Sequence, residues 1–396
     1  MVSCGLHQAS IALPDRRPYD DVCKRLRSHD WPQVGRSQEV LSCSVCKALR
    51  TQERSEVASS LDEVARQAGV SPATVSRALR GVGRVSEATR ARVVSAAAAL
   101  DYVISPAASS LARGTTGTVG VVVPYVERWF FATLISAAER VLREAGISVL
   151  LYNVGDQEGR ARFFHELPLR RRVDAVLVLS LPLSASEVDL LRDLAVPVVT
   201  VGLDAPGTDC VGIDDHAAAT SAMRHLLHLG HRDIAFIGED TPVPLGFTTP
   251  LRRRDAYRDA LHEAGIADGA LEVPGGFTID GGERAMTRLL SGHRLPTAVF
   301  VASDEMAFGA LRALRRAGLR PGRDISLIGF DDHDLADVLD LSTVAQPVLE
   351  QGKAAAQILL RRVRGDPDEP SRTVLDTHLV LRGSTAPQRE AAGEHD

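Results

Sequence analysis

The first helical pattern of hydrophobic residues lies within residues 60–80. Ser60 and Glu63 form a capping-box pattern that begins a helix, and Gly69 ends it. The apolar face of this helix consists of residues three or four positions apart: Leu61, Val64, Ala65 and Ala68. Ser71 caps a second helix after a turn of about three residues. The pattern therefore predicts two helices joined by a tight turn, a helix-turn-helix.

The hydrophobic pattern continues through a second and a third helix. On the second helix Val75 and Leu79 face inward, and the outer face consists of Pro72, Ala73, Ser76, Arg77 and Arg80. A third helix is expected from a cap at Ser86 to Leu100, which completes an all-α domain of three helices. A plain helical hairpin without a nucleic-acid role is the alternative that such short patterns leave open.

From residue 118 onward, short β-branched runs alternate with amphipathic stretches. Strands are expected at 119–123, 148–152, 175–179, 198–201, 234–237, 298–302 and 325–328. Helices are expected between them at 130–145, 186–194, 217–229, 251–264, 281–290 and 306–317. This alternation predicts an α/β fold with parallel sheets covered on both faces. Its repeat around a break near residue 230 indicates two similar subdomains, with a cleft beyond the carboxyl ends of the strands.

Charge is divided unequally along the 396 residues, which are enough for two or three domains. Residues 60–116 carry seven Arg against four acidic groups, whereas residues 117–396 carry 30 basic and 40 acidic groups. Only the front of the chain therefore suits a polyanion. There is no apolar run of about 18 residues and no signal-peptide pattern, so we expect a cytoplasmic protein without a membrane anchor.

Residues 1–59 show no sustained helical or strand period, and we expect them to be irregular or disordered. Cys43 and Cys46 have the gap of a zinc or redox pair, and Cys4 and Cys23 could complete four ligands. The spacing of these last two matches no familiar zinc module. We therefore favour unpaired thiols in a flexible tail and expect neither a metal nor a cofactor.

Residues 60–80 closely resemble the DNA-binding headpiece of the lactose repressor family of bacterial regulators. The shared motifs are Glu63-Val64-Ala65, Ala68-Gly69-Val70-Ser71 and Thr74-Val75-Ser76-Arg77, followed by Val85-Ser86, Thr89-Arg90 and Tyr102. Further segments resemble the sensor domain of that family: 119–124, 225–232, 302–307 and 328–332. The resemblance covers about residues 60–385 and implies a periplasmic-binding-protein-like sensor that closes around a small molecule. Family members begin a few residues before the first helix, so a native start near Val57 is also expected.

The resemblance implies the following divisions of the chain. Residues 1–59 form an N-terminal extension, 60–104 the helix-turn-helix domain, 105–117 a hinge helix and linker, 118–385 the effector-binding and dimerisation domain, and 386–396 a charged tail.

By position in the family, Arg77 is the main base-reading residue, and Ala73 and Pro72 occupy the other two base-facing positions. An arginine can make a bidentate contact with guanine, whereas Ala73 and Pro72 offer only apolar contact, for instance with a thymine methyl group. The positions that contact phosphate are Ser71, Thr74, Ser76, Arg84, Ser86 and Thr89. Helix capping and surface solvation are the alternative roles for these side chains.

Residues 105–117 resemble the hinge helix of the family, which forms in the dimer on DNA and inserts a leucine into the minor groove. Leu111 occupies that position, and Ala108 lies one turn before it. The usual Pro-Asn opening reads Ile104-Ser105 in this chain. Because a helix this short is unstable in isolation, its folding can be coupled to DNA binding. A flexible linker with an exposed leucine is the alternative.

The resemblance also implies residues that bind the effector. Arg253 falls where the family places an arginine on ligand hydroxyls or carboxylates, and Asp331 matches a ligand-binding acid. Ser303 replaces the usual Asn and is followed by Asp304. Apolar faces for a sugar ring or a base are offered by Trp129, Phe130 and Phe277, for which core packing is an equal alternative. Two departures from the family pattern, Gly202 and Ala345, leave the ligand chemistry open.

An enzyme and a transport-type solute-binding protein are the competing classes, since the same α/β architecture serves both. No Gly-x-Gly-x-x-Gly follows the first strand, no Gly-x-Ser-x-Gly elbow is present, and no His pair has zinc spacing on a helix. A solute-binding protein should carry an export signal and lack the headpiece. The expected protein is therefore a homodimeric, sequence-specific transcription regulator, more a repressor than an activator, in which dimers could pair further into tetramers. It would bind a pseudopalindromic operator on double-stranded DNA and respond to a small molecule, with a sugar first and a nucleoside or purine second.

Overall fold

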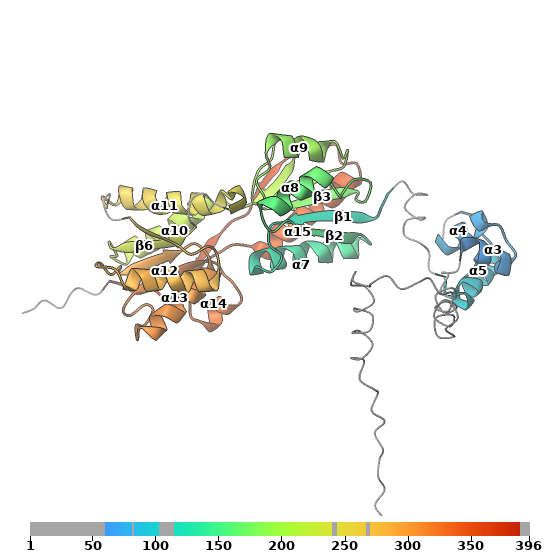
Figure 1. The fold of residues 1–396 in the computed structure, drawn as a ribbon. Coiled ribbons are helices and arrows are strands. Elements are labelled where there is room, and N and C mark those ends of the chain that lie inside the picture. The colour runs from blue at the N-terminus through green and yellow to red at the C-terminus, as the bar shows by residue number, and fades with distance from the viewer. Residues whose placement is uncertain (1–59, 81–82, 103–114, 240–243, 267–269, 389–396) are drawn as a thin grey trace, which may run out of the picture. The chain divides into compact units, whose positions relative to one another are not determined.

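The computed structural model describes residues 60–80, 83–102, 115–239, 244–266 and 270–388. The chain divides near residue 104 into two compact units (Figure 1). We call the first the headpiece and the second the α/β unit. No helix within the described ranges is long and apolar enough to cross a membrane. Leu111, Ala108 and the four N-terminal cysteines named above lie outside the described residues.

The headpiece consists of helices α3 (Leu61–Ala68), α4 (Pro72–Arg80) and α5 (Glu87–Ala99). The predicted capping box at Ser60 is present, because its hydroxyl accepts the Glu63 N–H and its own N–H donates to the Glu63 carboxylate. Gly69 ends α3 at φ 66°, a backbone conformation that favours glycine. The helices enclose a small core of Val64, Ala65, Ala68, Val75, Ala78, Val93, Ala96 and Ala97. The predicted three-helix domain is thus confirmed.

The first subdomain of the α/β unit has a parallel sheet in the order β11-β5-β4-β3-β1-β2. Its strands are β1 (Thr118–Val123), β2 (Ser148–Asn153), β3 (Ala175–Leu179), β4 (Val198–Val201), β5 (Asp209–Gly212) and β11 (Arg372–Val374). Its helices are α7 (Trp129–Glu144), α8 (Gln157–Glu166), α9 (Ala185–Arg192) and α15 (Val348–Val363). Helices α7 and α15 share one hydrophobic core with the sheet, and α8 and α9 share the other. The sheet is therefore covered on both faces, as its nearly continuous buried strands require.

The second subdomain repeats this arrangement in the order β12-β10-β9-β8-β6-β7. Its strands are β6 (Ile234–Gly238), β7 (Leu271–Pro274), β8 (Ala298–Val301), β9 (Ser326–Asp331), β10 (Ser342–Ala345) and the antiparallel β12 (His378–Val380). Its helices are α10 (Asp215–His228), α11 (Thr249–Glu263), α12 (Ile279–Leu290), α13 (Asp304–Arg316) and the short α14 (Leu335–Val338). A 3-10 turn, η2 (Pro244–Gly246), precedes α11. Figure 1 shows the two subdomains side by side within this unit.

The break between the subdomains was predicted near residue 230, and that position is wrong. The chain passes to the second sheet between β5 and α10, because α10 packs against α11 and the strands of the second sheet. It returns to the first subdomain through α15, since α15 packs against α7, and crosses again between β11 and β12. Eight elements of the α/β unit were not predicted from the sequence: β5, β7, β10, β11, β12, α8, α14 and α15.

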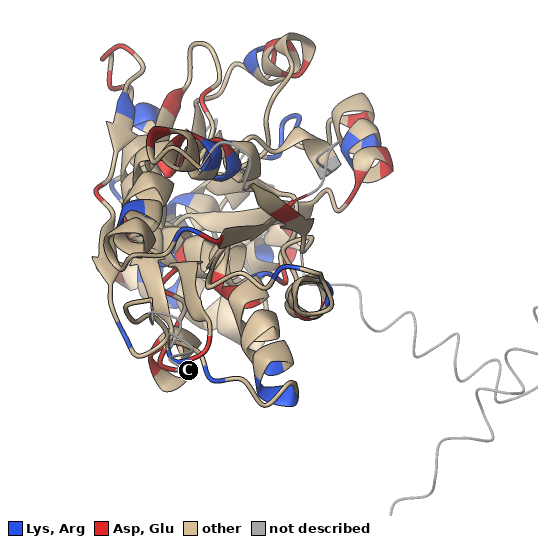
Figure 2. Ribbon diagram, turned by 90° about the vertical axis from the view of Figure 1, so that its left-hand side faces the viewer, with Lys and Arg blue, Asp and Glu red and all other residues tan. Residues whose placement is uncertain are grey.

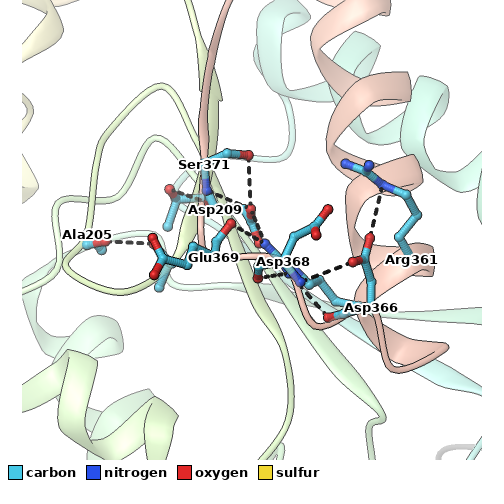
Figure 3. A network of polar contacts seen from close by, with 10 residues as sticks. Ala205, Asp209, Arg361, Asp366, Asp368, Glu369 and Ser371 are labelled. Carbon is cyan, nitrogen blue, oxygen red and sulfur yellow. Dashed lines mark hydrogen bonds and ion pairs between the residues drawn. The ribbon is translucent and has the colours of Figure 1, made fainter.

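Arg362 at the end of α15 holds the segment that leads into β11, because it donates to the carbonyls of Asp368 and Glu369. Figure 3 shows these two residues and Ser371 beside Asp209. The Nε and Nη2 of Arg362 donate to the two carboxylate oxygens of Asp209 on β5 at 2.7 and 2.8 Å. The N–H of Ser371 donates to the same carboxylate at 2.9 Å. Burial disfavours the Asp209 carboxylate, but the contacts with Arg362 and Ser371 outweigh it and lower the pKa of Asp209. This cluster fastens the edge strand β11 to the first sheet.

Candidate functional site

The outer face of α4 presents the three residues predicted to read bases. Arg77 is exposed, and its Nε donates to the carbonyl of Ala73, one turn earlier, at 3.2 Å. Ala73 and Pro72 are exposed at the start of the same helix, whose first turn holds no acidic residue. These three residues combine the guanidinium group of Arg77 with small apolar side chains, a set suited to the edge of a base pair.

Two of the six residues that were predicted to contact phosphate act as helix N-caps. The Ser71 hydroxyl accepts the Thr74 N–H at 3.2 Å, and the Ser86 hydroxyl accepts the Thr89 N–H at 3.3 Å. Both serines are exposed, as is Arg84 in the turn between α4 and α5. The capping that the sequence left as an alternative is therefore present. It also aligns the first N–H groups of both helices near the surface, where they can bind an anion.

A cavity of about 190 Å³ lies between the subdomains of the α/β unit. Nine of its lining residues stand at or directly beyond the carboxyl ends of strands from both sheets: Tyr125, Ser180, Gly202, Ile213, Glu239, Gly276, Ser303, Asp331 and Gln346. The predicted position of the cleft is thereby confirmed.

Five of the six predicted effector-binding residues line this cavity: Arg253, Asp331, Ser303, Phe130 and Phe277. Asp304 is the sixth, and it does not line the cavity. The aromatic residue Trp129 also lies elsewhere, since its ring stacks on His333 at 4.7 Å and its Nε1 donates to Asp334 at 3.2 Å.

Asp304 is fully buried at the start of α13. Its carboxylate accepts the Thr343 hydroxyl at 2.8 Å and the His333 N–H at 2.9 Å. Burial raises its pKa to about 7. These contacts connect α13 to β10 and to the loop after β9. Asp304 therefore positions the elements around the cavity and does not line it.

Arg253 of α11 lines the cavity and is 4% exposed. Its Nε and Nη2 contact the Asp215 carboxylate at 2.9 and 2.8 Å, and its Nη1 donates to the carbonyl of Ala302 at 2.7 Å. The guanidinium group also lies 3.5 Å from the ring centroid of Phe330. These partners fix its plane, with Nη1 3.7 Å from Asp331.

Asp331 begins a chain of hydrogen bonds that reaches the other subdomain. It accepts the Gln346 side-chain amide at 2.6 Å, and Gln351 of α15 donates to Gln346 at 3.1 Å. Burial raises the pKa of Asp331 to about 8, against the lowering effect of Arg253. Its φ of 129° lies in a region that favours glycine, so the surrounding structure holds it under backbone strain.

Sequence reasoning missed several polar and aromatic lining residues. The additional ones include Tyr125, Arg128, Phe131, Asp215, Glu239, Phe247, Glu305, Gln346 and Gln351. All four lining carboxylates, those of Asp215, Glu239, Glu305 and Asp331, come from elements of the second subdomain. The first subdomain contributes Arg128, which lies 4.1 Å over the ring of Tyr125. Inspecting the first residues after each predicted strand would have found Tyr125 and Glu239. Gln346 follows β10, a strand that was not predicted.

A short segment of the second subdomain covers one side of the cavity. Leu245 is 1% exposed within a core cluster of the first subdomain, and Arg160 of α8 donates to its carbonyl at 2.9 Å. Phe247 lines the cavity and lies 6.1 Å from the ring of Tyr125. The two subdomains are thus joined across the cavity by apolar burial as well as by the Asp331 hydrogen-bond chain.

Charged residues are distributed differently on the two units. Figure 2 shows acidic and basic residues interspersed over the helices of the α/β unit. In residues 60–116, by contrast, seven Arg stand against four acidic groups. Contacts with a polyanion therefore suit the headpiece better than the α/β unit.

Two family models match the chain. Residues 60–105 match the bacterial regulatory proteins of the lacI family, and residues 223–385 match the periplasmic binding protein-like domain. The two matches correspond to the headpiece and to most of the second subdomain with its connections.

Individual proteins are similar over most of the chain. The transcriptional repressor CytR of Escherichia coli K12 is 36% identical over 340 residues, which are 84% of this chain and 98% of CytR. Among solved structures, the lac repressor dimer bound to operator and the anti-inducer ONPF has a TM-score of 0.73 at 26% identity, covering 83% of this chain and 99% of that one. The complex of the transcriptional regulator CelR with cellobiose has a TM-score of 0.59 at 32% identity, covering 82% and 99%. The chain therefore belongs to the lacI family of bacterial transcriptional regulators, which bind DNA and are not enzymes.

Proposed function

We propose that the protein is a homodimeric repressor that acts in the cytoplasm, binds a pseudopalindromic operator and is controlled by a small polyhydroxylated molecule. The observation that carries this proposal is the cavity, because a buried Arg253–Asp331 pair and aromatic rings converge there from two joined subdomains. A ligand changes DNA affinity only if it binds one arrangement of the subdomains better than another.

In this proposal the headpiece reads the operator through α4. Arg77 contacts a guanine edge, and Ala73 and Pro72 make apolar contacts beside it. The sites proposed for phosphate are Ser71, Thr74, Ser76, Arg84, Ser86 and Thr89. The hinge residues Leu111 and Ala108 are proposed to enter the minor groove when two chains bind together.

A sugar is the first candidate for the effector. Ligand hydroxyls can donate to carboxylates such as Asp331 and accept from Arg253, while the apolar face of a sugar ring packs on Phe130 or Phe277. Ser303 is 3% exposed on the cavity wall and supplies a further hydroxyl partner. The structural similarity to CelR bound to cellobiose supports this class of ligand.

A nucleoside is the second candidate, because five aromatic side chains line the cavity: Tyr125, Phe130, Phe131, Phe247 and Phe277. A flat base can stack on such rings while its ribose hydroxyls use the same polar wall. Both candidate ligands would hydrogen-bond to the polar residues of the cavity. A nucleoside would stack on the aromatic side chains more extensively than a sugar.

Exposed apolar residues on α14 support a dimer. Leu335, Val338 and Leu339 are 47, 76 and 41% exposed, and they lie within one short segment of the second subdomain. Such a patch is typical of protein–protein interfaces. We propose that a second copy of the chain covers it, and the solved structure of the lac repressor is likewise a dimer.

Thermal unfolding of the full chain with ribose, cellobiose, cytidine and adenosine tests the ligand part of the proposal. A compound present at about 100 times its Kd stabilises the folded state by about 2.7 kcal/mol. The stabilisation should shrink in Phe130→Ala and persist in Glu139→Ala, because Glu139 on α7 does not line the cavity and pairs with Arg143 instead. If no sugar or nucleoside in a broad panel shifts the wild-type midpoint, the proposed effector class is wrong.

A further inference from the structure

The chain enters the α/β unit through residues 115–118, and the carboxylate of Asp174 holds this entry point. The N–H of Thr116 donates to Asp174 Oδ1 at 2.7 Å, and the N–H of Gly117 donates to Oδ2 at 2.6 Å. Two consecutive backbone amides thus share one carboxylate. Charge-assisted hydrogen bonds of this length are about twice as strong as neutral ones.

Backbone contacts fix the same residues from two other strands. The Asp174 N–H donates to the Thr118 carbonyl at 2.8 Å, and the Ser148 N–H donates to the Gly117 carbonyl at 2.9 Å. Gly117 adopts φ 64°, which turns the chain into β1. The entry point is therefore tied to the beginnings of β2 and β3 as well as to β1.

Strands β1 and β3 run from this anchor to the cavity. They pair in parallel from Val119 opposite Ala175 to Val122 opposite Val178, and these four residues are fully buried or nearly so. At their far ends the chain continues to Tyr125 and Ser180, which both line the cavity. The anchor and the cavity wall thus lie at opposite ends of one buried, hydrogen-bonded pair of strands, which moves as a rigid element.

We propose that Asp174 is a positioning residue that couples the cavity to the DNA-binding headpiece. Its carboxylate makes the last residues before β1 move with the first subdomain. A shift of this subdomain is therefore transmitted to the hinge segment, whereas without the carboxylate these residues could change conformation locally. This inference rests on the proposed function, in which residues 105–117 form the hinge. Asp174 contacts neither ligand nor DNA in this proposal.

Hydrogen exchange of the full chain tests the anchor without DNA or ligand. In Asp174→Ala the amides of Thr116 and Gly117 should exchange at least about tenfold faster, because both lose a charged acceptor. Asp174→Asn keeps one acceptor oxygen and should show a smaller increase. Asp193→Asn, a change at an exposed position after α9, should show none. Equal protection in all four proteins would overturn the anchor.

Binding to DNA tests the coupling. The probe is a duplex that the wild-type chain enriches from a random pool, compared with an unselected duplex of equal length. Asp174→Ala should lower the ratio of the two affinities at least about fivefold, which corresponds to about 1 kcal/mol of lost preference for the selected duplex. Asp174→Asn is a second, more conservative variant in case the alanine variant misfolds, and its ratio of affinities should lie between those of wild type and Asp174→Ala. If the wild type enriches no duplex, the proposed function fails while the exchange result still stands; if it does and both variants keep its ratio, the positioning role is wrong.

Discussion

The side chains proposed to bind DNA and those proposed to bind the effector lie in opposite surroundings. Arg77, Ala73 and Pro72 are exposed on α4, apart from the core that holds the three helices together. In the α/β unit, Arg253 and Asp331 are 4 and 8% exposed, and an ion-pair contact of 3.7 Å links them. A duplex is read from outside, whereas a small molecule must be enclosed, and this explains the contrast.

In the headpiece, the residues proposed for function contribute little to the stability of the fold. In the α/β unit, the residues proposed for function also stabilise the fold. An exposed side chain can be removed at little cost to the fold. Removing one member of a buried charged network leaves its partners without compensation. Substitutions in the two units should therefore give different patterns of loss.

The largest effect is expected from Arg253→Ala. It leaves Asp215 and Asp331 buried without their cation and should lower the free energy of unfolding by about 3–5 kcal/mol. Chemical denaturation measures this loss. Arg258→Ala is the matched control on the same helix, because Arg258 is half exposed and pairs with Glu272, and it should cost less than about 1 kcal/mol. Equal losses of unfolding free energy in the two variants would show that the buried charged network does not contribute more to stability than an exposed ion pair.

A smaller free-energy change, confined to DNA recognition, is expected from Arg77→Ala. Loss of a bidentate contact with a base should reduce the preference for the selected duplex by about 1–3 kcal/mol, roughly 5- to 150-fold. The unfolding free energy should stay unchanged, since the side chain is exposed. Competition gel shifts and denaturation of the same sample measure both, with Arg92→Ala on α5 as the control. A matching loss of stability in Arg77→Ala would contradict the separation of roles.

Ser60→Ala should affect only the headpiece. Loss of the capping box at α3 costs about 1 kcal/mol, because the Glu63 N–H loses its side-chain acceptor. Heat or denaturant should then unfold the headpiece earlier, with the transition of the α/β unit unchanged. A shift of both transitions would show that the two units unfold together.

The smallest effect is a pH dependence of the α/β unit. Burial lowers the pKa of His231, whose ring contacts Thr297, Ser326 and the Ala386 carbonyl. The unfolded chain binds a proton first as the pH falls below about 6.5, so the contribution of His231 is complete above that pH and declines below it, by at most about 1.4 kcal/mol per pH unit. The stability difference between wild type and His231→Gln should shrink accordingly on acidification, as denaturation at pH 7.5 and 5.5 would measure. A constant difference would show that His231 does not titrate in this range.

Local sequence patterns were sufficient to predict the headpiece, since its caps and apolar spacing lie within about 40 residues. They also predicted the parallel α/β architecture. They failed for β5 and β10, strands of four residues each whose buried positions include Asp209, Ser342 and Thr343. Buried polar groups there are satisfied by distant partners, such as Arg362 for Asp209, which no local pattern reveals.

The lining of the cavity was predicted only in part, because it too depends on contacts between residues far apart in the sequence. Ser303 and Asp304 are neighbours, yet only Ser303 lines the cavity, because α13 starts between them and turns Asp304 toward Thr343. Asp215 was missed because the break between subdomains was placed about 15 residues too late. Which residues converge depends on strand order, and strand order is set by long-range packing.

The most direct test of the account is a selection of the full chain against a random pool of duplexes, followed by titration of the enriched duplex with sugars and nucleosides. We expect an enriched inverted repeat, and the affinity of the protein for it should change about 5- to 150-fold with a compound that also stabilises the wild-type protein against heat. No enrichment of any duplex over random competitor, with or without these compounds, would contradict this expectation.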